Sequence, residues 1–254
     1  MIDIHSHILP GIDDGARSEE DSLHMAYQAV EQGIHTIIAT PHHKNNTFEN
    51  SRESILMHLD ILNNLFQSHE IPLTLLPGQE TRINGDFIND LQNGEILPLN
   101  QTSYVFVELP FDHVPQYTES LIYDIQMHGY KPIIAHPERN QELREQPDKL
   151  YNLVRKGALT QVTTGSLLGD FGKDVGRFTR EVIDHHLTHF IATDAHNTTS
   201  RPVNLWEAYD YIQDEIGADV YYMFLENAEF LVKNDIVQQN EPQRIQRKKF
   251  FGLF

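Results

Sequence analysis

Residues 1–24 read MIDIHSHILPGIDDGARSEEDSLH and describe a strand followed by a helix. The apolar run that begins at residue 2 ends near a Pro-Gly pair, a boundary typical of a buried strand. Ser18 and Asp21 then form the S-x-x-D arrangement that often begins a helix, and apolar residues recur at helical spacing after it. The N-terminus therefore predicts a complete βα unit.

The same unit recurs along the chain, although no sequence repeat is found. Six further strands are predicted at residues 35–42, 73–80, 104–109, 131–136, 159–164 and 188–194. Amphipathic stretches between and after them predict helices at residues 48–68, 117–128, 147–156, 175–186, 204–215 and 220–232. Strands that alternate with helices form parallel sheets, and about 250 residues is a usual size for a (β/α) barrel. We therefore predict an α/β fold in which residues 1–235 form a single domain.

The composition excludes several classes of protein. The 254 residues include 37 Asp and Glu against 19 Lys and Arg, which gives a net charge of −18. Such a charge repels phosphate backbones, so nucleic acid is not an expected partner. The absence of cysteine excludes disulfides, thiolate metal sites and cysteine nucleophiles. No stretch has the pattern of a signal peptide or a membrane helix, so we expect a cytoplasmic protein.

The C-terminal segment, residues 236–254, differs from the rest of the chain. Its last fourteen residues contain one acidic residue and four basic ones, followed by large apolar side chains: Glu241, Arg244, Arg247, Lys248, Lys249, Phe250, Phe251, Leu253 and Phe254. A basic and aromatic tail of this kind suits an acidic partner, the barrel of a neighbouring subunit or a membrane surface. A frayed, solvated terminus is the alternative. The sequence does not choose between them, and it leaves the oligomeric state open.

Side chains that bind metals gather where the predicted strands end. Six of the seven strands end in such a residue, and a further candidate lies in the loop after the first strand: His5, His7, Asp14, His42, Glu80, Glu108, His136, Asp194 and His196. In a parallel barrel these strand ends meet on one face, where such enzymes place their chemistry. Nine nitrogen and oxygen ligands are too many for one ion, and they favour two or three ions of Mn, Fe, Zn or Co.

Six motifs in this order resemble those of the polymerase and histidinol phosphatase (PHP) superfamily. They are His5-Ser-His7, Thr40-Pro-His42, Gly78-Gln-Glu80, Glu108-Leu-Pro110, His136-Pro-Glu-Arg139 and Thr193-Asp-Ala-His196. The opening MIDIHSHILPGIDDGA and the segment HPERN are most similar to the Gram-positive capsule-type branch, whose members are metal-dependent protein-tyrosine phosphatases that counteract bacterial tyrosine kinases. The resemblance covers residues 1–235.

This resemblance implies a distorted seven-stranded (β/α)7 barrel, the PHP fold, with a centre of three manganese ions. His5, His7, Glu80 and Asp194 would hold one ion. Glu80 would bridge to a second ion held by Glu108 and His136, and Asp14, His42 and His196 would hold the third. The expected substrates are phosphotyrosine proteins, among them a bacterial tyrosine kinase linked to capsule or exopolysaccharide synthesis.

Two arginines follow predicted ligands at short distance. Arg139 lies three residues after His136, and Arg201 lies five residues after His196. A guanidinium group matches a phosphate with two parallel hydrogen bonds, so both are predicted as catalytic, substrate-binding residues. No general acid is assigned, because a departing phenol has a pKa of about 10 and needs little help.

Two other functions fit the same ligand set. A small-molecule phosphatase of the histidinol-phosphate type would use the same metals with a smaller pocket. A non-enzymatic metal-binding scaffold is the second alternative, although an intact ligand set argues against it.

Overall fold

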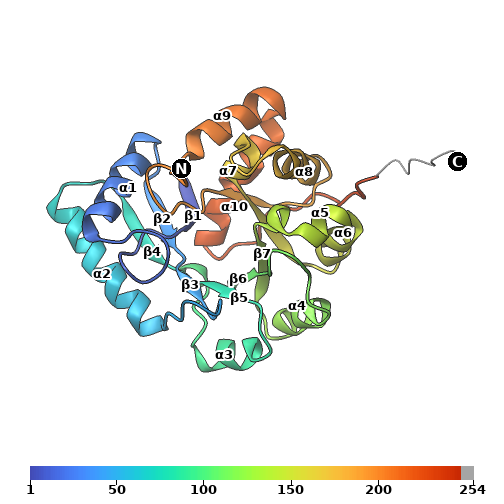
Figure 1. Cartoon of the computed structure of the whole chain (residues 1–254), viewed down its shortest axis with the longest axis horizontal. Coiled ribbons are helices and arrows are strands. Elements are labelled where there is room, and N and C mark those ends of the chain that lie inside the picture. The colour runs from blue at the N-terminus through green and yellow to red at the C-terminus, as the bar shows by residue number, and fades with distance from the viewer. Residues whose placement is uncertain (247–254) are drawn as a thin grey trace, which may run out of the picture.

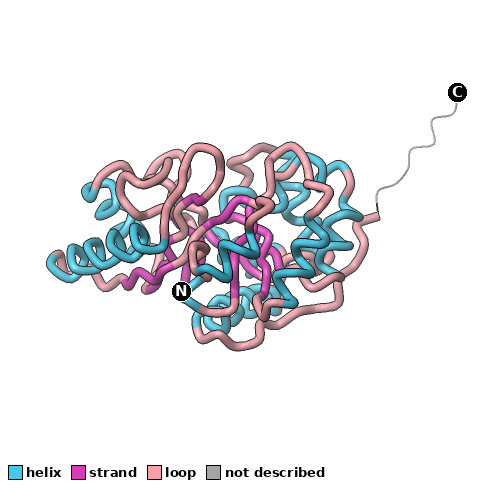
Figure 2. The backbone as a smooth tube through the Cα atoms, turned by 90° about the horizontal axis from the view of Figure 1, so that it is seen from below, coloured by secondary structure: helices cyan, strands magenta, loops and turns pink. Residues whose placement is uncertain are grey.

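The computed structural model describes residues 1–246, which form a barrel of parallel strands surrounded by helices (Figure 1). The strands are β1 (Ile2–Ser6), β2 (Thr36–Ala39), β3 (His42–His43), β4 (Thr74–Pro77), β5 (Glu80–Arg82), β6 (Tyr104–Glu108), β7 (Lys131–Ala135), β8 (Leu159–Thr163) and β9 (Phe190–Ala192). Figure 2 shows them enclosed by helices, with loops at both ends of the barrel. The predicted α/β barrel is confirmed.

Two of the seven predicted strands are each interrupted once. The predicted strand 35–42 corresponds to β2 and the first residue of β3, which are separated at Thr40 and Pro41, and proline has no N–H for the sheet. The predicted strand 73–80 corresponds to β4 and the first residue of β5, which are separated at Gly78 and Gln79, and β5 continues to Arg82. The sheet therefore divides into β1-β2-β4 and β3-β5-β6-β7-β8-β9, in which all pairs are parallel. The sequence did not predict these breaks, which distort the barrel.

The barrel closes between β1 and the segment that follows β9. The Asp194 N–H donates to the His5 carbonyl, and the His7 N–H donates to the Ala195 carbonyl, both at 2.8 Å. The buried Asp3 carboxylate accepts hydrogen bonds from the backbone and the hydroxyl of Thr193, at 3.0 and 2.5 Å. Burial raises the pKa of Asp3 to about 6, although the bonds from Thr193 act in the opposite direction. One side chain thus fastens the first strand to the last.

The predicted long helices are present with small shifts at their ends. They are α1 (Glu19–Glu31), α2 (Arg52–Ser68), α4 (Thr118–Met127), α6 (Pro147–Arg155), α8 (Lys173–Asp184), α9 (Leu205–Glu215) and α10 (Ala218–Val232). The Ser18 side chain caps α1 by accepting from the Asp21 N–H at 3.2 Å, as the S-x-x-D pattern predicts. Three shorter helices were not predicted: α3 (Phe87–Asn93), α5 (Gln141–Glu145) and α7 (Thr164–Leu168). They span at most two turns, too little for a periodic pattern.

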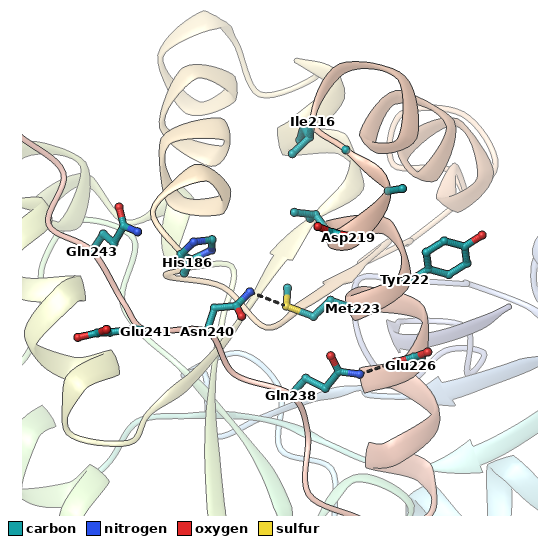
Figure 3. Close-up of a pocket in the computed structure, with 13 residues that line it drawn as sticks. His186, Ile216, Asp219, Tyr222, Met223, Glu226, Gln238, Asn240, Glu241 and Gln243 are labelled. Carbon is teal, nitrogen blue, oxygen red and sulfur yellow. Dashed lines mark hydrogen bonds between the residues drawn. The ribbon is translucent and has the colours of Figure 1, made fainter.

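The described part of the C-terminal segment lies against the barrel. Val237 and Ile245 are buried, and Arg244 pairs with Asp148 of α6 at 2.6 Å. Residues 238–243 run past α8 and α10 and line a groove of about 950 Å³, where Asn240 donates to Met223 (Figure 3). The remaining predicted tail residues, Arg247, Lys248, Lys249, Phe250, Phe251, Leu253 and Phe254, lie outside the described residues. Within residues 1–246, no helix has the length and apolar character needed to span a membrane.

Candidate metal centre and substrate cleft

The structure brings the nine predicted ligands together at one end of the barrel. Seven of them are buried, while His42 is partly exposed and Asp14 is half-exposed. Two lie just after their strands with left-handed backbone: His136 with φ 33° and Asp194 with φ 53°. Such conformations are costly for residues other than glycine and are typical of functional sites, where the surrounding structure enforces them.

Glu80 occupies the middle of the cluster. Its Oε1 lies 2.7 Å from His136 Nε2, and its Oε2 lies 2.9 Å from His42 Nδ1. The same Oε2 lies 3.4 Å from His7 Nε2 and 3.5 Å from His5 Nε2. A carboxylate that faces four imidazoles from three strands can be shared between ions.

Asp194 links the cluster to both predicted arginines. Its Oδ1 lies 3.1 Å from His7 Nε2 and 3.4 Å from His5 Nε2. Its Oδ2 accepts from Arg139 at 2.5 Å and from Arg201 at 2.6 Å. The two oxygens of one buried carboxylate therefore face the candidate ligands on one side and two guanidinium groups on the other.

Asp14 completes the exposed side of the cluster. Its Oδ1 lies 3.4 Å from both His42 Nε2 and His196 Nε2. Ligand atoms that lie within 4.8 Å of one another form three overlapping groups: His7, Asp14, His42 and His196; His5, His7 and Glu80; and His42, Glu80 and Glu108. His7 belongs to the first and second groups, and His42 belongs to the first and third. The predicted division assigns each of these two histidines to one ion only.

Several buried ligand atoms lack a hydrogen-bond partner, which tests whether the residues fit metal ions. These atoms are His42 Nδ1, Glu80 Oε2, Glu108 Oε2, Asp194 Oδ1 and His196 Nε2. A buried polar atom without a partner is costly, and buried charges are normally paired or bound to metal. All five belong to predicted ligands and point into one cluster. The donor set, imidazole and carboxylate without sulfur, fits divalent ions such as Mn, Fe, Zn or Co.

The carboxyl groups of the cluster respond differently to their surroundings. Burial acts to raise the pKa of Glu80, but the adjacent histidines hold it well below its usual value. Burial and the neighbouring Glu80 carboxylate raise the pKa of Glu108 to about 7. Burial also acts to raise the pKa of Asp194, but Arg201 and Arg139 hold it well below its usual range. Glu80 and Asp194 are thus anions, and they attract cations to the cluster.

A second layer of side chains orients the histidines. Asp13 lies 2.7 Å from His7 Nδ1 and also accepts from the backbone N–H groups of Gly15 and His42, at 2.9 and 3.1 Å. Gln161 of β8 lies 2.9 Å from His5 Nδ1. The Asp13 loop passes so close to β1 that a Cβ at Gly15 would lie 2.0 Å from the His7 carbonyl oxygen. Asp13 and Gln161 therefore leave the Nε2 atoms of both histidines free to face the cluster.

Sequence reasoning did not identify these supporting residues. The pair Asp13-Asp14 gave a partial signal, since two adjacent carboxylates cannot both point into one site. Gln161 lies on the one predicted strand without a His, Asp or Glu at its end. A polar side chain in that strand is a weak signal that only the three-dimensional pairing makes clear.

The substitution Asp13→Asn is expected to weaken metal binding about 10- to 100-fold, because partners of ligating histidines typically contribute that much. The amide cannot hold His7 and the Gly15 loop with the same charge. Titration of the metal-free protein with Mn²⁺, followed by calorimetry, measures the change. Asp60→Asn on the exposed face of α2 is the matched control. Equal Mn²⁺ affinity in the two variants would contradict the orienting role.

A cleft of about 470 Å³ opens over the cluster. Candidate ligands lie at its floor, and arginines and phenylalanines form its walls: Asp14, His42, Glu108, His136, Arg82, Arg139, Arg144, Arg201, Phe48, Phe111 and Phe171. Four of the 19 Lys and Arg residues of a strongly acidic chain thus line one cleft. Both predicted arginines are among them, which places their guanidinium groups beside the cluster.

Three phenylalanines stand at the mouth of the cleft, each against a polar residue of the site. Phe48 stacks on His42 with ring centroids 6.3 Å apart, and Phe111 stacks on His136 at 5.9 Å. Phe171 lies under the Arg139 guanidinium at 3.9 Å. Phe111 and Phe171 are 54% and 39% exposed, so their rings are accessible to a group that enters the cleft.

Apart from Arg139 and Arg201, the wall residues were missed from the sequence. Arg82 carried a signal, because it lies two residues after Glu80 on one strand and so points to the same side. It donates to Glu108 at 3.0 Å and to the Leu109 carbonyl at 3.1 Å. Arg144 and the phenylalanines come from loops and a short helix, where no periodicity marks them.

Comparison with known proteins shows the family of this chain. The family model "Capsular polysaccharide synthesis, CpsB/CapC" matches residues 1–233. The tyrosine-protein phosphatase YwqE of Bacillus subtilis is 49% identical over the full length of both chains, and CapC of Staphylococcus aureus is 37% identical over the same extent. The crystal structure of YwqE, described as a metal-dependent tyrosine phosphatase, superimposes with a TM-score of 0.95 over 97% of this chain and all of that one. The chain belongs to the CpsB/CapC family.

Proposed function

We propose that this protein is a metal-dependent protein-tyrosine phosphatase. The observation that carries the proposal is a cluster of buried ligand atoms without hydrogen-bond partners, which lies at the floor of a cleft walled by arginine and phenylalanine. We further propose three manganese ions, and a bacterial tyrosine kinase of capsule or exopolysaccharide synthesis among the substrates. The tyrosine-phosphatase name of YwqE, at 49% identity, supports the activity.

The nine predicted ligands would hold the ions in overlapping groups. His5, His7, Glu80 and Asp194 face one another, as do Asp14, His42 and His196. Glu108 and His136 both lie close to the Glu80 carboxylate. When bound, divalent ions supply positive charge for the phosphate and lower the pKa of a water so that it can attack near neutral pH.

Arg139 and Arg201 would bind the phosphate oxygens. One guanidinium nitrogen of each arginine donates to Asp194 Oδ2, and this hydrogen bond fixes the position of the side chain before substrate binds. Donors that are held in place stabilise developing charge without the cost of reorganisation. Their convergence on one oxygen places two positive charges side by side at the edge of the cluster.

Phe48, Phe111 and Phe171 would contact the phenyl ring of phosphotyrosine. Aromatic rings pair favourably, and apolar walls exclude water from the cleft. The phosphate of a phosphoserine lies closer to its backbone, so the rim would hinder its approach to the floor. The phenolate leaves readily because the pKa of tyrosine is about 10, and we assign no general acid.

Full activity is expected to require metal and to be independent of thiol chemistry. Chelation should abolish hydrolysis of a phosphotyrosine peptide, and Mn²⁺ should restore it. Iodoacetamide should have no effect, because the chain has no cysteine. Steady-state rates on the peptide and on histidinol phosphate, with metal content measured alongside, give the test. Faster turnover of histidinol phosphate would favour the small-molecule alternative, and no turnover of either by the metal-loaded protein would favour the scaffold.

A further inference from the structure

Arg144 lies on the wall of the cleft outside the cluster itself. It belongs to α5, is partly buried, and lines the same cavity as Arg139 and Phe171. Its guanidinium donates to the Glu138 carbonyl at 3.0 Å. Because Glu138 is the residue before Arg139, this bond holds Arg144 next to the segment that carries a predicted phosphate-binding arginine.

Arg144 differs from the other arginines of the cleft in its partners. Arg82 pairs with Glu108, and both Arg139 and Arg201 pair with Asp194. Among residues 1–246, by contrast, no carboxylate lies within ion-pair distance of Arg144. Its positive charge therefore remains available to a group that enters the cleft.

The acidic neighbours of Arg144 on its own helix are already engaged. Glu142 accepts from Lys149 and from the Val114 N–H. Glu145 accepts from the Gln141 side chain at 2.8 Å. Residues one or two positions apart on a helix also do not face each other. The helix therefore does not neutralise the cation that it presents to the cleft.

An uncompensated arginine on this wall matters because of the charge of the whole protein. At −18, the chain repels an acidic peptide, and local positive charge is needed to bind one. The phosphate itself would be met at the floor of the cleft. A cation on the wall is therefore placed for a different part of the substrate. Because an extended peptide advances only about 3.3 Å per residue, that part is a residue close in sequence to the phosphotyrosine.

We propose that Arg144 binds an acidic side chain of the substrate, close in sequence to the phosphotyrosine. This inference rests on the proposed phosphatase function and adds a substrate preference to it. The contact is a charge-assisted hydrogen bond in a partly exposed cleft, and such contacts discriminate between ligands and weaken with salt. The protein would therefore select phosphotyrosines that lie in acidic sequence.

The preference can be measured with a set of phosphopeptides. Each peptide carries one phosphotyrosine and one Glu, placed in turn at positions −3 to +3 among neutral residues, and an all-neutral peptide is the reference. For the metal-loaded full chain, we expect kcat/KM to be about tenfold higher with Glu at one or two positions, the size of one charged hydrogen bond. The gain should appear mainly in KM and should shrink as the salt concentration rises.

Variants assign the preference to Arg144. In Arg144→Gln the ratio between the best Glu peptide and the neutral peptide should fall to about one, and in Arg144→Lys it should be partly retained. Arg155→Gln on the exposed end of α6 removes the same charge outside the cleft and should keep the wild-type ratio. The ratio is taken within each variant, so a partly unfolded preparation does not alter it.

The outcomes separate this inference from the function on which it rests. Failure of the metal-loaded wild type to hydrolyse any of the phosphopeptides overturns the proposed function, and the inference with it. Hydrolysis with equal kcat/KM for the Glu and neutral peptides overturns the inference alone. A preference that persists in Arg144→Gln, or that is equally lost in Arg155→Gln, also overturns it.

Discussion

Glu80→Gln is expected to lower kcat/KM for a phosphotyrosine peptide by more than about 100-fold and to remove most of the bound metal. Residues that only orient metal ligands already contribute about 10- to 100-fold to metal affinity or activity. Glu80 is placed to bind the metal directly, so its loss should cost more. Its two oxygens lie within 3.5 Å of four histidines from three strands. The amide has the same shape but carries no charge and offers one acceptor oxygen in place of two.

Metal content by mass spectrometry and steady-state kinetics measure the effect of Glu80→Gln. The matched control is Glu53→Gln, an exposed residue in the first turn of α2. Thermal unfolding monitors whether the variant still folds. Near-normal metal content together with a near-normal rate would exclude Glu80 as a shared ligand.

Replacement of Arg139 or Arg201 with Ala is expected to lower kcat/KM by about 100-fold or more, equal to about 3 kcal/mol of transition-state stabilisation. Both guanidinium groups line the cleft beside the cluster and are already held by Asp194. Each single variant keeps the other arginine on Asp194, so metal content should stay near that of the wild type. Arg→Lys should rescue only part of the activity, because an ammonium group cannot form two parallel bonds.

The arginine variants also distinguish phosphate binding from a structural role. Arg177→Ala, an exposed residue of α8, is the matched control for loss of charge. Loss of metal in step with loss of activity would indicate that the arginine acts by holding Asp194. Unchanged kcat/KM in both Ala variants would mean that phosphate is bound without them.

The fold could be predicted because its signals are local and repeated. Most βα units have an apolar run, a turn and an amphipathic helix, and the Ser18 cap of α1 shows how a few residues define a boundary. The breaks at Pro41 and Gly78 are harder to predict. Where β2 and β4 pack, a Cβ at Gly78 would lie 2.6 Å from Ile38 Cγ2, a contact between distant segments that no local pattern records.

The candidate ligands could be predicted because strand ends of a parallel barrel converge by geometry. The sequence could not show which of two adjacent residues binds metal and which one orients a ligand. Asp13 and Asp14 are alike as residues, yet one supports His7 and the other faces His42 and His196. Likewise, Phe111 and Phe171 reach one cleft from separate loops, so only tertiary structure brings them together.

The closure of the barrel has a consequence for biosynthesis. Asp3 and Thr193 are 190 residues apart in sequence. Their neighbours His5 and Asp194 lie in the same cluster. A nascent chain therefore cannot complete the centre until its last strand has left the ribosome. Contacts between such distant segments slow folding. A ligand that binds only the native state stabilises only that state. Metal binding would therefore stabilise full-length molecules, whereas truncated chains would stay exposed to proteolysis.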